Sequence, residues 1–129
     1  MIAPVFDVNR LILLAADNPN FILELFEKFI IDFSGSENRI KKRLQDGHYA
    51  QAGIETYKLK GAAGNLGAYA LQKACVKLET DIKVGIIKPA TLIDFSATLN
   101  EVLSACIDYL TPTQLLKFPL IIIMIYKNG

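Results

Sequence analysis

The sequence predicts an all-α protein, an antiparallel up-and-down four-helix bundle with a short N-terminal helix. Apolar residues recur at spacings of three and four along the main segments, as they do on the buried face of a helix. No segment before Leu116 alternates with the period of two that is typical of a half-buried strand. The connections between segments are short, so neighbouring helices are expected to run antiparallel.

Length and composition indicate one folded domain without a general nucleic-acid or membrane surface. The chain has 129 residues, of which 52% are hydrophobic and 21% charged, and this composition excludes a disordered tail. The 14 Lys and Arg residues nearly balance 13 Asp and Glu residues, giving a net charge of +1. We therefore expect no nucleic-acid or membrane partner. The bundle is expected over residues 1–112.

Two helices are expected in the first third of the chain. Phe6–Ala16 predicts a short helix that packs across one end of the bundle. Asn18–Pro19 predicts the start of a long helix, because asparagine caps free amides and proline suits the first turn. This helix is expected to bend at Gly35 without ending, and to stop at Asp46–Gly47. Its apolar stripe comprises Ile22, Phe26, Phe29, Phe33, Ile40 and Leu44.

Three further helices complete the predicted bundle. They are expected over His48–Asn65, over Ala68–Val84, and from Pro89 to Leu110. The apolar stripes of the last two comprise Leu71, Cys75, Leu78 and Ile82, and then Leu92, Phe95, Leu99, Val102, Cys106 and Leu110.

The tail 113–129 does not continue this pattern. Its apolar run Leu120–Tyr126 is rich in β-branched residues and far too short to span a bilayer. It could dock on the bundle or pair with another chain, and an exposed run of this kind is an aggregation hazard. We assign it no function, and we expect the protein to be a monomer.

The titratable side chains predict neither a metal site nor a cofactor. Cys75 and Cys106 lack a metal-ligand spacing, and His48 is the single histidine of the chain. Two thiols at helical spacing are usual for small buried side chains in a reducing compartment. The first ten residues do not have the pattern of a secretion signal, so a cytoplasmic location is expected.

The segment Glu55–Glu79 contains glycines within an otherwise helical pattern. Each glycine in a helix costs about 1 kcal/mol relative to alanine, so Gly61, Gly64 and Gly67 call for an explanation. Gly64 and Gly67 could simply help to end the helix, which is plausible for Gly67 but explains Gly61 poorly.

We therefore interpret the glycines as part of an exposed docking strip. The core face of this helix comprises Leu59, Ala62, Ala63 and Leu66. The strip on roughly the opposite side comprises Tyr57, Lys60, Gly61 and Gly64. Such a strip would let the backbone of another molecule, or a phosphoryl group, come close to the helix.

The stretch "YKLKGAAGNLGAYAL", followed by "KLE", resembles the signature of histidine phosphotransfer (HPt) domains of bacterial phosphorelays. That signature reads His-x-Leu-Lys-Gly-Ala-Ala-Gly-Asn-Leu-Gly-Ala, with a Leu-Glu or similar pair on the next helix. The resemblance covers about Phe6–Leu110 and includes the order of the helices. It departs from the family at Tyr57, which occupies the position of the phosphoaccepting histidine.

The resemblance implies a role for each neighbour of this position. Lys60 matches the lysine that offsets the phosphoryl charge. An exposed lysine is by default only a solvated charge, but its place one turn from Tyr57 favours the phosphate-neighbour role. Gly61 matches the small residue that keeps the acceptor accessible. Glu79 matches the residue that often orients the imidazole, but it could equally pair with Lys83 four residues further on.

Tyrosine changes the chemistry that this position could support. Imidazole has a pKa near 6.5 and forms a labile N–P bond, whereas a phenol has a pKa near 10 and forms a stable aryl ester. Lys60 could favour the phenolate of Tyr57, but it would not make the ester labile. His48 lies about 13 Å away along the helix and faces another direction, so it is not expected to substitute.

The favoured hypothesis is thus a pseudo-HPt domain without catalytic activity, which docks receiver domains through the strip around Tyr57 but carries no phosphate. Its partners would be a response-regulator receiver domain, a hybrid sensor histidine kinase, or both. One alternative is an active phosphorelay intermediate whose histidine has been substituted by tyrosine. The others are a purely structural helical bundle and a regulatory site phosphorylated on tyrosine.

Overall fold

The computed structural model describes residues 5–15, 18 and 20–110. Every regular element in this part of the chain is an α-helix, so the all-α prediction is confirmed. The predicted tail 113–129, with its run Leu120–Tyr126, lies outside the described residues. The helices are α1 (Val8–Ala15), α2 (Asn20–Phe33), α3 (Ser36–Gln45), α4 (Tyr49–Leu66), α5 (Tyr69–Val84) and α6 (Pro89–Tyr109).

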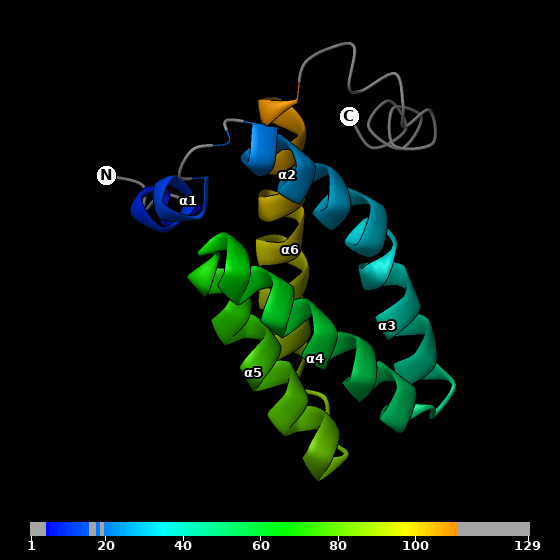
Figure 1. Cartoon of the computed structure of the whole chain (residues 1–129). Helices are drawn as coiled ribbons and strands as arrows, with labels where there is room; N and C mark the ends of the chain where they lie inside the picture. Colours follow the sequence, from blue (N-terminus) through cyan, green and yellow to red (C-terminus); the bar gives the residue numbers. More distant parts are fainter. Residues whose placement is uncertain (1–4, 16–17, 19, 111–129) are drawn as a thin grey trace.

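The helices surround one core (Figure 1). Helix α4 packs against α5 and α3, α5 packs against α6, and α6 packs against α2. Helices α2 and α3 follow each other along one side of the molecule, with α4 and α5 across from them and α6 behind (Figure 1). The short helix α1 packs on α2 at one end.

The expectation of one long bent helix before Asp46 is wrong, because the helix ends at Phe33 and α3 begins at Ser36. The guanidinium of Arg39 spans the break and would lie 2.6 Å from a Cβ at Gly35. Its Nη2 donates to the carbonyl oxygen of Asp32 and to the hydroxyl of Ser36, both at 3.1 Å. The side chain thus satisfies a backbone acceptor at the end of α2.

Glycines lie at the ends of α3, α4 and α5, and the sequence analysis named two of them, Gly47 and Gly67. Gly67 ends α4 with φ +70°, and its N–H donates to the last turn of that helix. Gly85 ends α5 with φ +84°, and Gly47 follows α3 with φ +79°. The side chain of Asn18 accepts from the N–H of Asn20 at 3.1 Å, which fits its predicted capping role.

The turn between α5 and α6 is fixed by the buried carboxylate of Asp81. Its Oδ2 accepts from the backbone N–H of Lys88, the N-cap residue of α6, at 3.0 Å. This hydrogen bond lowers the pKa of Asp81 from its ordinary value, although burial opposes the shift. Pro89 then starts α6, as predicted.

The core contains most of the apolar positions that the helical periodicity selects. Helix α6 is long and apolar enough to cross a membrane by length and composition, but in this structure it contributes buried side chains to the core. Burial raises the pKa of both thiols, Cys75 and Cys106, to about 12, so neither thiol ionises near neutral pH. Fully buried side chains include Phe26, Ile30, Ile40, Leu59, Leu71, Leu78, Phe95 and Leu99.

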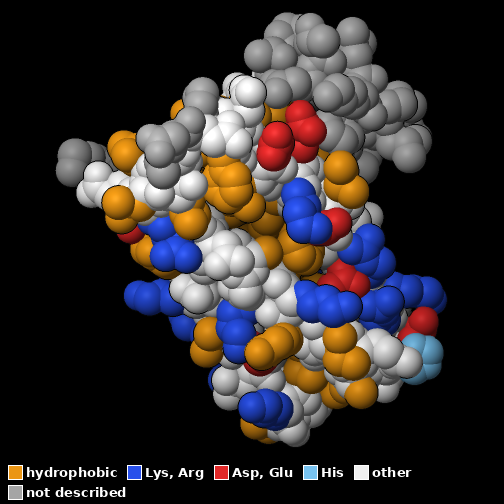
Figure 2. Space-filling view, viewed as in Figure 1, with side chains coloured by type: hydrophobic (Ala, Val, Ile, Leu, Met, Phe, Trp, Pro, Cys, Tyr) orange, Lys and Arg blue, Asp and Glu red, His pale blue; other side chains and the backbone are white. Residues whose placement is uncertain are grey.

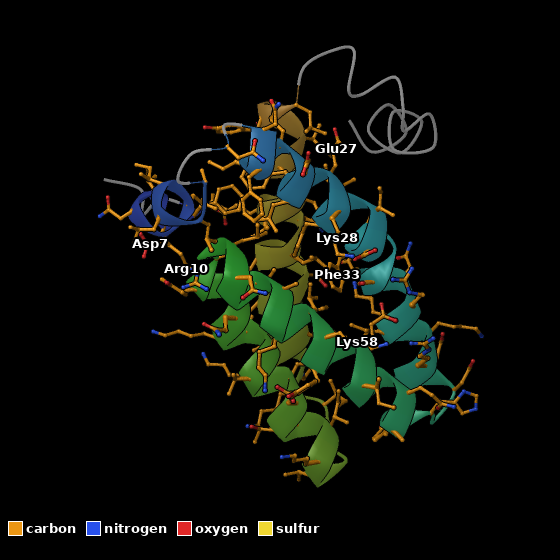
Figure 3. All side chains as sticks on the ribbon, in the orientation of Figure 1. Asp7, Arg10, Glu27, Lys28, Phe33 and Lys58 are labelled. Carbon is orange, nitrogen blue, oxygen red and sulfur yellow. The ribbon has the colours of Figure 1, made fainter. Side chains whose placement is uncertain are left out.

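The N-terminal segment is anchored to the turn between α4 and α5. The backbone N–H of Asp7 donates to the carbonyl oxygen of Gly67 at 3.0 Å. The guanidinium of Arg10 donates to the carbonyl oxygen of Asn65 at 3.2 Å (Figure 3). Phe6 stacks on Phe26 with ring centroids 4.9 Å apart. The short helix therefore lies across one end, and it begins at Val8, two residues later than predicted.

Candidate functional site

Helix α4 has a buried face and an exposed face on opposite sides. Leu59, Ala63 and Leu66 are buried in the core, as predicted, while Ala62 is half-buried. Tyr57 lies on the outward face and is 63% exposed. The helix thus presents an accessible tyrosine directly opposite its core face.

Tyr57, Lys60 and Glu79 form one cluster. The ammonium Nζ of Lys60 lies 4.7 Å from the centroid of the Tyr57 ring, within the range of a cation–π contact. The same ammonium lies 2.7 Å from a carboxylate oxygen of Glu79 on α5. Lys60 therefore bridges the tyrosine of one helix and the glutamate of the next.

The structure agrees with neither of the two interpretations of Glu79, which were orientation of the residue at position 57 and pairing with Lys83. Glu79 pairs with Lys60 across the helices and not with Lys83 on its own helix. The hydrogen bond to Glu79 raises the pKa of Lys60. The positive charge of Lys60 is thus matched by a carboxylate within the protein.

Gly61 is exposed, and a Cβ at this position would meet no atom within 4 Å. Its place on the open face agrees with the predicted strip. We expect Gly61→Ala to raise the free energy of unfolding by up to about 1 kcal/mol, because alanine is the better helix former and the space is empty. Chemical denaturation measures this change, and a loss of stability would contradict the open site.

Gly64 is a correction to the predicted strip. It faces α5, where a Cβ would lie 2.7 Å from the side-chain amide nitrogen of Gln72. Gly64 therefore leaves room for the end of the Gln72 side chain between the two helices. The wheel of α4 places it on the same side as Lys60, which is the side next to α5.

A hollow of about 410 Å³ lies beside Tyr57, between α4 and α5. Its lining is mainly apolar and includes Gly53 and Ile82, with Glu79 and Lys83 at the edge. Ile54, next to it on the outward face, is 57% exposed. The aromatic ring of Tyr57 therefore stands at the edge of an apolar depression.

A second ionic cluster lies on the other side of α4, and the sequence analysis missed it. The carboxylate of Glu55 is 11% exposed and lies 2.9 Å from Nη2 of Arg39 and 2.7 Å from Nη1 of Arg43. One sequence signal could have suggested this pairing: Arg39 and Arg43 are four residues apart and so lie on the same face of the helix that precedes Glu55. The cluster joins α3 to α4.

Burial and ion pairing act on Glu55 in opposite directions. Burial by itself raises the pKa of Glu55, but hydrogen bonds from Arg39 and Ser36 and the charges of Arg39 and Arg43 outweigh it. The net result is a pKa below the ordinary value of 4.5. Glu55 is therefore ionised at neutral pH and holds both arginines.

The described residues contain no group of three or more His, Cys, Asp and Glu side chains that could hold a metal ion. His48 is the exposed N-cap residue of α4 and lies on a different turn from Tyr57, as the sequence analysis expects. His48 and Tyr57 are therefore not placed to act together in one reaction.

None of the protein-family models, curated proteins and solved structures compared with this chain matches it. The resemblance to HPt domains therefore stays a prediction, based on the residues of α4 and α5 and on their arrangement.

Proposed function

We propose that this protein is an HPt-like signalling domain that docks receiver domains of a phosphorelay through the face around Tyr57, without carrying phosphate. The observation that carries this proposal is the cluster of exposed Tyr57 with Lys60 and Glu79, next to the open surface at Gly61. Tyr57 and Gly61 lie on the exposed side of α4, where a partner can reach them, and Lys60 and Glu79 lie beside them where α4 meets α5.

The chemistry of the cluster supports docking over phosphate relay. A relay domain needs a nucleophile whose phosphoryl adduct is labile, and a tyrosine ester is stable. The Lys60 ammonium is already paired with Glu79 at 2.7 Å, so less of its charge is available to a phosphoryl group. The mainly apolar hollow beside Tyr57 suits contact with a partner protein.

The arrangement of the helices is compatible with the family architecture. We propose an up-and-down four-helix bundle in which α2 and α3 together form one member and α4, α5 and α6 the others. The contacts of α4 with α3 and α5, and of α6 with α5 and α2, support this topology. We further propose a monomeric, cytoplasmic domain whose partners are a receiver domain, a hybrid sensor kinase, or both.

Receiver binding measured together with phosphotransfer tests the proposal. The chain and its Tyr57→His variant are titrated with isolated receiver domains from the same genome, unphosphorylated and then radiolabelled. We expect both proteins to bind the same receiver, and only Tyr57→His to take up acid-labile phosphate. The reason is that the substitution restores a nucleophile while Lys60, Gly61 and Glu79 remain in place.

Two variants control this experiment. Tyr57→Phe keeps the ring under Lys60 and should bind like the native chain without accepting phosphate. Tyr109→His creates a histidine at another tyrosine that is 59% exposed, and it should remain unlabelled. If neither the native chain nor Tyr57→His binds any receiver, the docking function is wrong. Label on native Tyr57 would overturn the claim that it carries no phosphate.

A further inference from the structure

A second groove runs along the other side of α4, between this helix and α2. It has a volume of about 330 Å³ and is lined by residues of α2 and α4. Figure 2 shows hydrophobic side chains in the hollowed region between these helices, with Lys and Arg side chains beside it. The apolar part of the lining comprises Leu25, Phe29, Phe33, Ala62 and Leu66.

Small residues of α4 keep this groove open. Gly61 lines it and has no atom within 4 Å of a Cβ position, and Ala62 follows directly. A larger side chain at Gly61 would enter free space beside the groove. The opening therefore depends on a residue that weakens the helix, which gives Gly61 a use beyond access to Tyr57.

Two lysines stand on opposite sides of the groove. Lys28 comes from α2 and Lys58 from α4, with Phe33 near them, as Figure 3 shows. Both lysines are exposed. Lys28 lies 3.1 Å from Asp32, whereas Lys58 has no carboxylate at salt-bridge distance within the described part of the chain. The rim therefore carries a positive charge that is available to a ligand.

The positive charge continues into the neighbouring hollow between α3 and α4. Arg39, Arg43 and Glu55 line this hollow of about 460 Å³, together with Asp32, Phe33 and Lys58. Asp32, Phe33 and Lys58 line both hollows, so the two hollows form one continuous surface. Along it, four cationic side chains face two carboxylates, on a protein whose net charge is only +1.

We propose that the groove between α2 and α4 is a second docking surface, which binds an amphipathic helix carrying acidic residues beside its apolar stripe. The apolar floor would hold the stripe, and Lys58 would pair with a carboxylate beside it, whereas Lys28 on the facing rim is already paired with Asp32 at 3.1 Å. This groove lies on the opposite side of α4 from the Lys60–Glu79 pair. The inference therefore does not depend on receiver recognition at Tyr57.

A pair of synthetic peptides tests the groove directly. Each peptide is labelled with fluorescein, is designed to form a helix of about 15 residues, similar in length to α2, and carries leucines at helical spacing. Glutamates flank the leucines in one peptide and lysines in the other. By fluorescence anisotropy on the full chain, we expect the acidic peptide to bind and the basic peptide to bind at least roughly tenfold more weakly.

Variants locate the bound peptide. Lys58→Glu should weaken binding of the acidic peptide about tenfold, and Gly61→Leu should weaken it similarly by filling the groove. Because Lys58 also lines the hollow beside Tyr57, the loss in Gly61→Leu is the one that assigns the peptide to this groove. Matched changes on the other side of α4 are Lys83→Glu and Ala50→Leu, both at exposed residues of the hollow beside Tyr57. These controls should leave the affinity unchanged, and circular dichroism checks that each variant remains folded.

Three results would each overturn the proposal that the groove binds an acidic helix. They are equal affinity for the two peptides, no binding of the acidic peptide, and equal losses of affinity from the matched variants on the two sides of α4. The peptide assay contains no receiver domain, so its failure leaves the proposed function at Tyr57 standing. Conversely, peptide binding without receiver binding would support the groove and refute the receiver proposal.

Discussion

Gly67→Ala is expected to lower the free energy of unfolding by about 2–4 kcal/mol. Gly67 has φ +70°, where a side chain costs about 1–2 kcal/mol. A Cβ would also lie 2.7 Å from Cβ and 2.9 Å from the backbone nitrogen of Asp7. The N-terminal segment would have to move, which adds an overpacking cost of about 1–3 kcal/mol.

Gly85→Ala is the matched control for this prediction. Gly85 has a similar φ of +84°, but a Cβ there meets no atom within 4 Å. We therefore expect only the conformational cost of about 1–2 kcal/mol. Denaturant unfolding of the two variants measures the difference, and limited proteolysis reports whether α1 is released in Gly67→Ala. Equal losses of stability in the two variants would mean that the close approach of Asp7 to Gly67 adds nothing to the cost of a side chain at Gly67.

Glu55→Gln is expected to lower the free energy of unfolding by about 2 kcal/mol at pH 7. The substitution keeps the shape of the side chain but removes the charge that accepts hydrogen bonds from Arg39 and Arg43. Hydrogen bonds to charged groups contribute about 1.5–3 kcal/mol. Because both arginines are more than one-third exposed, water can solvate them after the change, and the loss should stay below that of a fully buried pair.

The pH dependence of this loss follows from the lowered pKa of Glu55. A carboxyl group with a lower pKa in the folded state stabilises the protein fully above its unfolded value of about 4.5. This stabilisation disappears as the pH falls through the lower, folded-state pKa. The native chain and Glu55→Gln should therefore differ most near neutrality and converge in acid.

Glu101→Gln provides the control, since Glu101 is exposed on α6. It should change the stability by less than about 0.5 kcal/mol at any pH. Urea unfolding between neutral and acidic pH compares the three proteins. A constant difference between the native chain and Glu55→Gln across this range would show that the charge of Glu55 does not stabilise the fold.

Local sequence signals determined the helices and most of their ends. The apolar periodicity selects Phe26, Leu59, Leu78 and Leu99 for the core, where all four are buried. Gly67 and Gly85 end their helices for a reason that is local to the backbone, namely positive φ. The motif around Tyr57 placed Lys60 and Gly61 correctly on an accessible part of α4, because helical geometry fixes relative directions along one helix.

Only the tertiary structure decided which side chains from different helices meet. Glu79 pairs with Lys60 and not with Lys83, because the packing of α5 on α4 brings the first pair to 2.7 Å. Gly64 faces Gln72 for the same reason. Arg39, which spans the break at Gly35, pairs with Glu55 on another helix. Periodicity describes one helix at a time, whereas ion pairs and close approaches between helices depend on how those helices pack.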